Sequence, residues 1–94
     1  MAQTPRELAI KTRNRKLKFM RELKHDKACA DCGISYPYYV MQYDHVWGDK
    51  VFSLSHCDRY SWEEIISEVE KCEIVCANCH HTRTWSRIQP EWSD

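Results

Sequence analysis

The stretch Cys76-Ala77-Asn78-Cys79-His80-His81 decides the fold, because it joins a C-x-x-C pair directly to two histidines. Thiolate and imidazole are the ligands that zinc prefers, and a spacing of two residues lets one tight turn offer both sulfur atoms to one ion. A second pair, Cys29 and Cys32, lies upstream in the chain. We expect the thiolates of Cys29, Cys32, Cys76 and Cys79 to close a structural zinc site.

Two other uses of these residues stay open. The six cysteines of the 94-residue chain could form disulfides, as in many small secreted domains. The sequence starts without an apolar leader and has no stretch of the roughly 20 apolar residues that span a membrane, so we expect a cytoplasmic protein in which zinc is favoured over disulfides. His80 could also replace one cysteine in a Cys₃His site. Cys57 and Cys72 lack pair spacing and are expected to be free thiols, with Cys72 buried.

Charge is unevenly distributed along the chain although the formal net charge is zero. Residues 1–27 hold nine Lys or Arg against three acids, a net charge of +6, and the remaining residues carry −6. This asymmetry favours a basic N-terminal arm that binds a polyanion, with a solvated helix face as the alternative. The cations of the arm that we expect to contact a nucleic acid are Arg13, Arg15 and Lys16.

Local signals predict an α+β domain at residues 28–94, preceded by a helical arm at residues 1–27. Thr4-Pro5 suits a helix start, and the first half of that helix should be exposed. Residues 38–43 are rich in β-formers, and residues 51–54 form a plausible second strand or extended piece. Ser61 and Glu64 make a capping box for a helix that ends near Lys71. An extended segment at 72–75 then precedes a helix at 77–87, which Pro90 should stop.

The sequence also predicts which side chains of the last two helices are buried and which are exposed. We expect Trp62 and Trp85 at core positions. The acidic residues of the middle helix should face water, namely Glu63, Glu64, Glu68 and Glu70.

Asp44, His45 and His80 supply the chemistry that the cysteines do not. Asp44 offers a hard oxygen that suits Mg²⁺ or Mn²⁺, and His45 titrates near neutral pH, as a general base should. Both side chains could reach one cleft if they lie at the end of a strand. His80 directly follows the last cysteine, so a zinc knuckle would fix its backbone. One acid and one histidine on a metal, with a second histidine over water, are the minimum set for metal-assisted phosphodiester hydrolysis.

Four motifs, in this order and spacing, resemble the HNH endonuclease family, and in particular its small zinc-containing members from phages and bacteria. They are C-x-x-C-G from Cys29, Tyr-Asp-His-Val around Asp44, E-x-x-K-C-E-I-V-C-A-N-C-H ending at His80, and the x-x-Arg-Thr that follows. The similarity covers residues 29 to about 85. It implies a ββα-metal (His-Me finger) fold, in which two antiparallel strands and a helix clasp a divalent ion.

The resemblance also implies roles for single residues. His45 would be the general base, Asp44 and His80 the ligands of a catalytic Mg²⁺, Mn²⁺ or Ni²⁺, and the four cysteines the holders of a structural zinc. DNA would be the substrate, in a host cytoplasm if the chain is phage-encoded. The family asparagine that braces the loop of the base is Lys71 here. Further nucleic-acid contacts are expected from Arg83, Arg87 and His81.

Two alternatives to an enzyme stay open. The chain could be a non-catalytic, zinc-stabilised nucleic-acid-binding module. It could also be an adaptor in a larger phage complex, such as a packaging machine.

Overall fold

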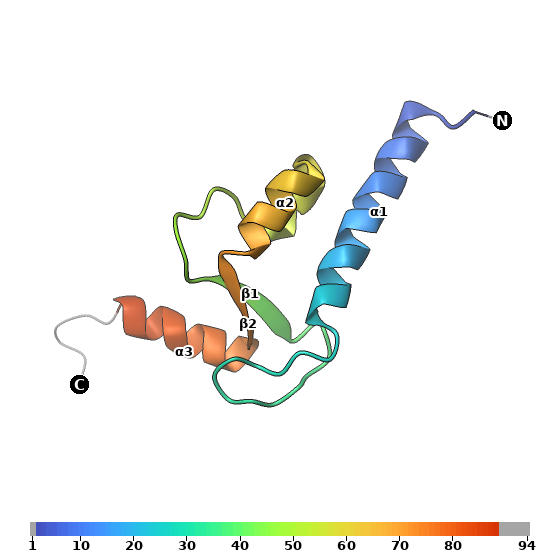
Figure 1. Ribbon diagram of the computed structural model, residues 1–94. Helices are drawn as coiled ribbons and strands as arrows, with labels where there is room; N and C mark the ends of the chain where they lie inside the picture. The colour runs from blue at the N-terminus through green and yellow to red at the C-terminus, as the bar shows by residue number, and fades with distance from the viewer. Residues whose placement is uncertain (1, 89–94) are drawn as a thin grey trace.

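The computed structural model describes residues 2–88, which form a small α+β domain around a two-stranded antiparallel sheet. Figure 1 shows the long first helix beside the sheet and the last helix on the opposite side of it. The elements in chain order are α1 (Pro5–Lys24), β1 (Met41–His45), a 3₁₀ helix η1 (Leu54–Arg59), α2 (Trp62–Val69), β2 (Cys72–Cys76) and α3 (Ala77–Ile88). The expected α+β class is thereby confirmed.

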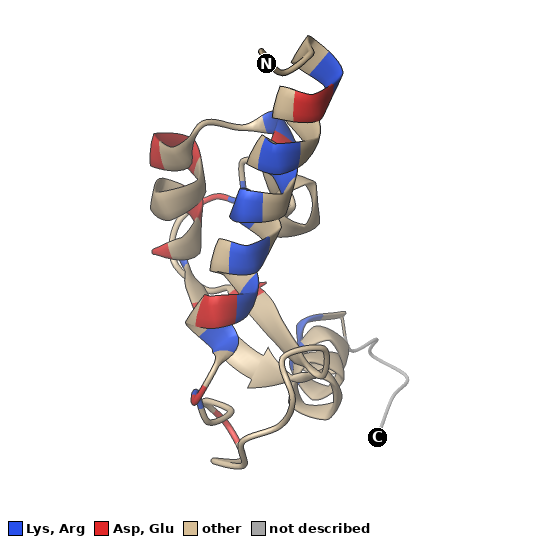
Figure 2. Cartoon of the chain, turned by 90° about the vertical axis from the view of Figure 1, so that its right-hand side faces the viewer, with Lys and Arg blue, Asp and Glu red and all other residues tan. Residues whose placement is uncertain are grey.

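Helix α1 begins where the sequence predicts, because Thr4 and Glu7 form a capping box and Pro5 occupies its first turn. Residues 5–15 are exposed, and only the second half of the helix packs on the domain, through Leu17, Phe19 and Met20. Figure 2 shows Lys and Arg along most of the length of α1. Within residues 2–88, none of the helices is long and apolar enough to cross a membrane.

Strands β1 and β2 pair antiparallel, from Met41 opposite Cys76 to His45 opposite Cys72. The first strand therefore starts three residues later than predicted, since the residues before it form a turn in which the Val40 N–H bonds to the Pro37 carbonyl. The possible strand at 51–54 is not formed. Phe52 is buried in an irregular loop and Leu54 is buried at the start of η1. The strand that pairs with β1 is instead the segment that ends in Cys76.

Two small apolar clusters flank the sheet. One joins α1, the loop, η1 and α2 through Met20, Phe52, Leu54, Cys57 and Ile65. The other surrounds the cysteine pairs and contains Cys29, Met41, Val75 and Cys76.

The two tryptophans expected in the core lie at the surface. Trp62 is 39 % exposed and Trp85 is 46 % exposed, so that prediction is wrong. The ring of Trp62 packs edge-on against Phe19 at 5.3 Å between centroids, at the margin of the first cluster. Cys72 is half-buried rather than buried.

Helix α3 follows β2 without a connecting residue and runs over nearly the predicted range. The expected stop at Pro90 lies outside the described residues. Because no loop separates the two elements, the position of β2 fixes where α3 starts.

The fully buried side chain of Ile65 tests the first cluster. We expect Ile65→Ala to lower the free energy of unfolding by about 2–5 kcal/mol in urea titrations, since it removes buried methyl groups and leaves a cavity. The neighbouring Ile66 is 46 % exposed, and Ile66→Ala should change the free energy of unfolding by only about 0.5 kcal/mol. Equal effects of the two substitutions would contradict this packing.

Candidate functional site

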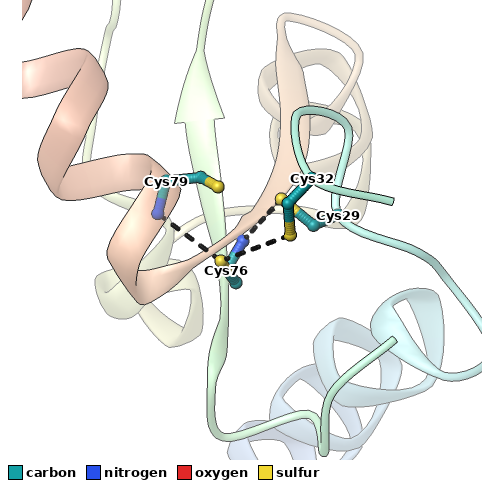
Figure 3. Close-up of side chains that lie close together, drawn as sticks. All are labelled: Cys29, Cys32, Cys76 and Cys79. Atoms are coloured by element: carbon teal, nitrogen blue, oxygen red, sulfur yellow. Dashed lines mark hydrogen bonds between the residues drawn. The ribbon is translucent and has the colours of Figure 1, made fainter. Parts of the chain in front are cut away.

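The four paired cysteines converge although the two pairs are far apart in sequence. Their sulfur atoms all lie within 4.8 Å of one another, and Figure 3 shows them facing a common centre between the loop after α1 and the start of α3. Four sulfurs around a tetrahedral ion at a bond length of about 2.3 Å would stand about 3.8 Å apart. The cluster therefore fits a structural metal ion, zinc or another that prefers thiolates.

Backbone N–H groups stabilise negative charge on these sulfurs. The Cys76 N–H donates to Cys29 Sγ at 3.3 Å, and the Cys79 N–H donates to Cys76 Sγ at 3.4 Å. Burial raises the pKa of Cys29, but bonds from the backbone of Cys32, Cys76 and Asp31 outweigh it and lower this pKa to about 6. The bond with Cys76, together with burial, raises the pKa of Cys79 to about 12. A bound cation would allow all four thiols to ionise together.

The geometry does not match the two alternatives for the cysteines. The Sγ atoms of Cys32 and Cys76 are 4.0 Å apart, about twice the length of a disulfide bond of roughly 2.05 Å. His80 is hydrogen-bonded away from the cluster, to Gln42, so the cluster has four sulfur ligands rather than three and an imidazole.

Asp44 is a buried carboxylate held by two arginines of α3. Its Oδ2 accepts hydrogen bonds from Arg83 Nη1 at 2.8 Å and Arg87 Nη2 at 2.7 Å, and its Oδ1 accepts one from Arg87 Nη1 at 2.7 Å. The bonds from Arg87, and then those from Arg83, hold the pKa of the Asp44 carboxyl well below its ordinary value, although burial acts in the opposite direction. Asp44 is therefore ionised throughout the neutral range.

His80 lies beside this carboxylate on the same face of β1. One ring nitrogen, Nδ1, bonds to Gln42 Oε1, and the other, Nε2, stands 3.4 Å from Asp44 Oδ1. An amide oxygen can only accept, so Nδ1 carries the proton and, in the neutral ring, Nε2 offers its lone pair toward Asp44. The structure thus brings together the two residues predicted to hold a catalytic metal.

His45 points the other way, because neighbouring side chains of a strand face opposite sides. Its Nε2 lies 2.8 Å from Oε2 of Glu68 on α2. The prediction that Asp44 and His45 reach one cleft at the end of a strand is therefore wrong, because the two side chains lie on opposite faces of β1. They contact α3 and α2 respectively.

Glu68 is the functional candidate that sequence reasoning missed. It was expected to face water but is only 2 % exposed. Helical spacing could have predicted this burial. Glu68 lies three residues after Ile65 and one before Val69, which places it on the apolar side of α2. Its other oxygen, Oε1, accepts from Lys71 Nζ at 2.8 Å, and that ammonium also donates to the Asp49 carbonyl at 2.8 Å.

His45 and His80 both line a cleft of about 430 Å³, to which residues of α1 also contribute. Arg21 and Lys24 of α1 and Lys50 of the loop after β1 line the same cleft. The guanidinium of Arg21 lies 5.3 Å from the Tyr38 ring centre, and the Lys24 ammonium lies 5.1 Å from that of Tyr43. Two imidazoles and three cations are therefore among the side chains that line this one cleft.

The predicted nucleic-acid contacts have different surroundings. Arg83 and Arg87 contact Asp44, and Arg83 also bonds to Asp31. Lys16 is buried, with its ammonium bonded to the Tyr60 carbonyl, so it has a structural role. The remaining three are exposed: Arg13, Arg15 and His81.

Replacing Asp44 tests the charge cluster. Asp44→Asn should lower the free energy of unfolding by about 1–3 kcal/mol near pH 7, because Arg83 and Arg87 lose a charged acceptor. The folded-state pKa of Asp44 lies below its unfolded value, which is about 3.9. The stabilisation should therefore be complete above about pH 5 and decrease as the pH falls below about 4 toward the folded pKa.

Urea titrations at several pH values measure this difference between wild type and variant. Asp26→Asn, at an exposed carboxyl after α1, is the matched control and should show a small difference at every pH. A difference for Asp44→Asn that grows on acidification would contradict the assignment.

Comparison with protein-family models, curated proteins and solved structures finds no match to this chain.

Proposed function

We propose that the chain is a metal-dependent HNH endonuclease that hydrolyses phosphodiester bonds in DNA, built on a ββα-metal fold of β1, β2 and α3. The observation that carries this proposal is the shared cleft, whose lining includes His45 and His80 together with Arg21 and Lys24 of α1. Two titratable imidazoles next to fixed positive charge suit the hydrolysis of an anionic ester.

The cysteine cluster is proposed to hold zinc in a structural role. Four thiolates this close together are the usual set of a closed zinc site, which leaves no position for water or substrate. The ion would clamp the loop carrying Cys29 to the start of α3. His80, the next residue after Cys79, would be positioned by this clamp.

His45 is proposed as the general base. It lies at the end of β1 with its ring partly exposed to the cleft, and one ring nitrogen is engaged by Glu68. The other nitrogen is available to take a proton from water as the water oxygen bonds to phosphorus. The bond from phosphorus to the leaving oxygen breaks, and that oxygen takes a proton from the solvent. Proton transfer of this kind contributes about 10²–10⁴-fold to a rate.

Asp44 and His80 are proposed to hold a catalytic Mg²⁺, Mn²⁺ or Ni²⁺. Their facing oxygen and nitrogen atoms are 3.4 Å apart, and two acceptors so close favour a cation between them. Within residues 2–88, the cysteine cluster is the one group of three or more potential ligands, so these two residues would act as a pair. Such an ion, when bound, stabilises negative charge on the phosphate. Arg87 would have to release Asp44 Oδ1 to make room for it.

DNA is the proposed polyanion. Arg21, Lys24 and Lys50 would contact phosphates at the cleft, and the exposed Arg13 and Arg15 would extend the contact along α1. Each neutralised phosphate releases counterions, so binding should be sequence-neutral and salt-sensitive.

One observation favours the non-catalytic alternative. Asp44 is already neutralised by Arg83 and Arg87, so the pair of potential metal ligands is satisfied without a metal. A zinc-stabilised DNA-binding module would keep the cations of α1 and bind DNA without cutting it.

A plasmid-nicking assay with Mg²⁺, Mn²⁺ and Ni²⁺ tests the enzyme. We expect wild type to nick supercoiled DNA and His45→Ala to be slower by about 10²-fold or more, because the base is lost. His56→Ala is the matched control, since His56 is exposed and outside the cleft, and it should nick at the wild-type rate. Identical, uncut plasmid with wild type and His45→Ala in every metal would overturn the proposal and leave the binding module.

Metal content and melting temperature test the zinc. Purified protein should contain one zinc per chain, and Cys76→Ser should lose it and unfold, because such sites contribute on the order of 10 kcal/mol of apparent binding energy near pH 7. Cys72→Ala, outside the cluster, should retain the zinc. An unchanged melting temperature for Cys76→Ser would exclude the structural role.

A further inference from the structure

We infer that Glu68 is a positioning residue for His45, and that Lys71 holds Glu68 in that role. The inference rests on the proposed function, in which His45 is the general base that accepts a proton from water. The tautomer of the His45 ring can be measured whether or not the protein cuts DNA.

Glu68 reaches His45 from a different element and is nearly enclosed. Its side chain is 2 % exposed, and its Oε2 lies 2.8 Å from His45 Nε2 while accepting the Val51 N–H at 3.0 Å. A buried carboxylate with several donors is stable only as the anion. Burial raises the pKa of Glu68, but bonds from Lys71, Val51 and His45 outweigh it and lower the pKa below its ordinary value.

An ionised carboxylate accepts hydrogen bonds and donates none. The proton of the neutral His45 ring must therefore sit on Nε2, where it donates to Glu68. Nδ1 is left with a lone pair, which is the atom that can accept a proton from water. Glu68 thus selects the tautomer and also fixes the orientation of the ring.

Lys71 makes this arrangement possible in two ways. Its ammonium balances the buried charge of Glu68 through Oε1, and it ties the same network to the loop after β1 through the Asp49 carbonyl. The Lys71 carbonyl accepts the N–H groups of Val46 and Trp47, directly after His45. A lysine at the position of the family asparagine can therefore brace the loop that follows the base, and its partner Glu68 supplies the acceptor that a lysine lacks.

Spectra of nitrogen-15-labelled protein test the inference directly, with the His45 signals assigned by their absence in His45→Ala. In its neutral form, the His45 ring of wild type should show the Nε2–H tautomer. In Glu68→Gln a single amide oxygen is shared by Lys71, Val51 and His45, so the Nδ1–H tautomer should appear. Glu63→Gln, at an exposed position of the same helix, should leave the His45 signals unchanged.

Nicking rates give the second readout. Glu68→Gln should lower kcat by about 10–100-fold with a smaller change in KM, the loss typical for a partner that orients a functional histidine. Glu63→Gln should keep wild-type kcat. If wild type nicks DNA and Glu68→Gln does so at the same kcat, the inference fails while the proposed enzyme stands.

The wild-type spectrum can overturn the inference even if Glu68→Gln does not fold. An Nδ1–H tautomer of His45 in wild type would overturn the inference whatever the activity. An Nε2–H tautomer of His45 that is lost in Glu68→Gln, in a protein that never nicks DNA, would support the positioning by Glu68 and reject the enzyme.

Discussion

Four sulfur atoms within 4.8 Å of one another connect the loop after α1 to the junction of β2 and α3. The rest of the structure depends on this connection, because the two apolar clusters are small and the sheet has only two strands. Small domains of this kind usually need a metal or disulfides to supplement a thin core. The second cysteine pair of this cluster lies at the junction of β2 and α3, directly before His80 and on the helix whose arginines contact Asp44.

Successive side chains of β1 face opposite sides of the sheet, and this divides the remaining polar groups into two sets. Gln42 and Asp44 face α3, where His80 and two guanidinium groups meet them. Tyr43 and His45 face α1 and α2, where a backbone carbonyl and Glu68 meet them. Within residues 2–88, every buried side-chain nitrogen or oxygen atom has a hydrogen-bond partner. Charge is thus accommodated inside a domain of this size by pairing each buried group across elements.

Signals that act over a few residues predicted the fold well. The capping residues Thr4 and Ser61 predicted the helix starts, and the spacing of the cysteine pairs predicted the cysteine cluster, since each depends on local geometry. Contacts between distant segments could not be predicted in the same way. The burial of Glu68 and Lys16 depends on which elements pack on them, and the exposure of Trp62 depends on where the first cluster ends. The β-formers at 51–54 did not predict a strand correctly, because the partner of β1 is the segment 72–76. The roles of Asp44, His45 and His80 in catalysis stay predictions.

Arg83 has a further consequence for how the sequence can vary. The sheet register places Asp44 directly opposite Glu73, two like charges on one face. Arg83 Nη1 contacts both, at 2.8 Å from Asp44 Oδ2 and 3.1 Å from Glu73 Oε1. Loss of the arginine alone would leave two carboxylates facing each other, whereas its loss together with the negative charge of Glu73 removes the repulsion. Positions 73 and 83 should therefore vary together among related sequences. The double substitution should destabilise the protein less than the sum of the two single substitutions.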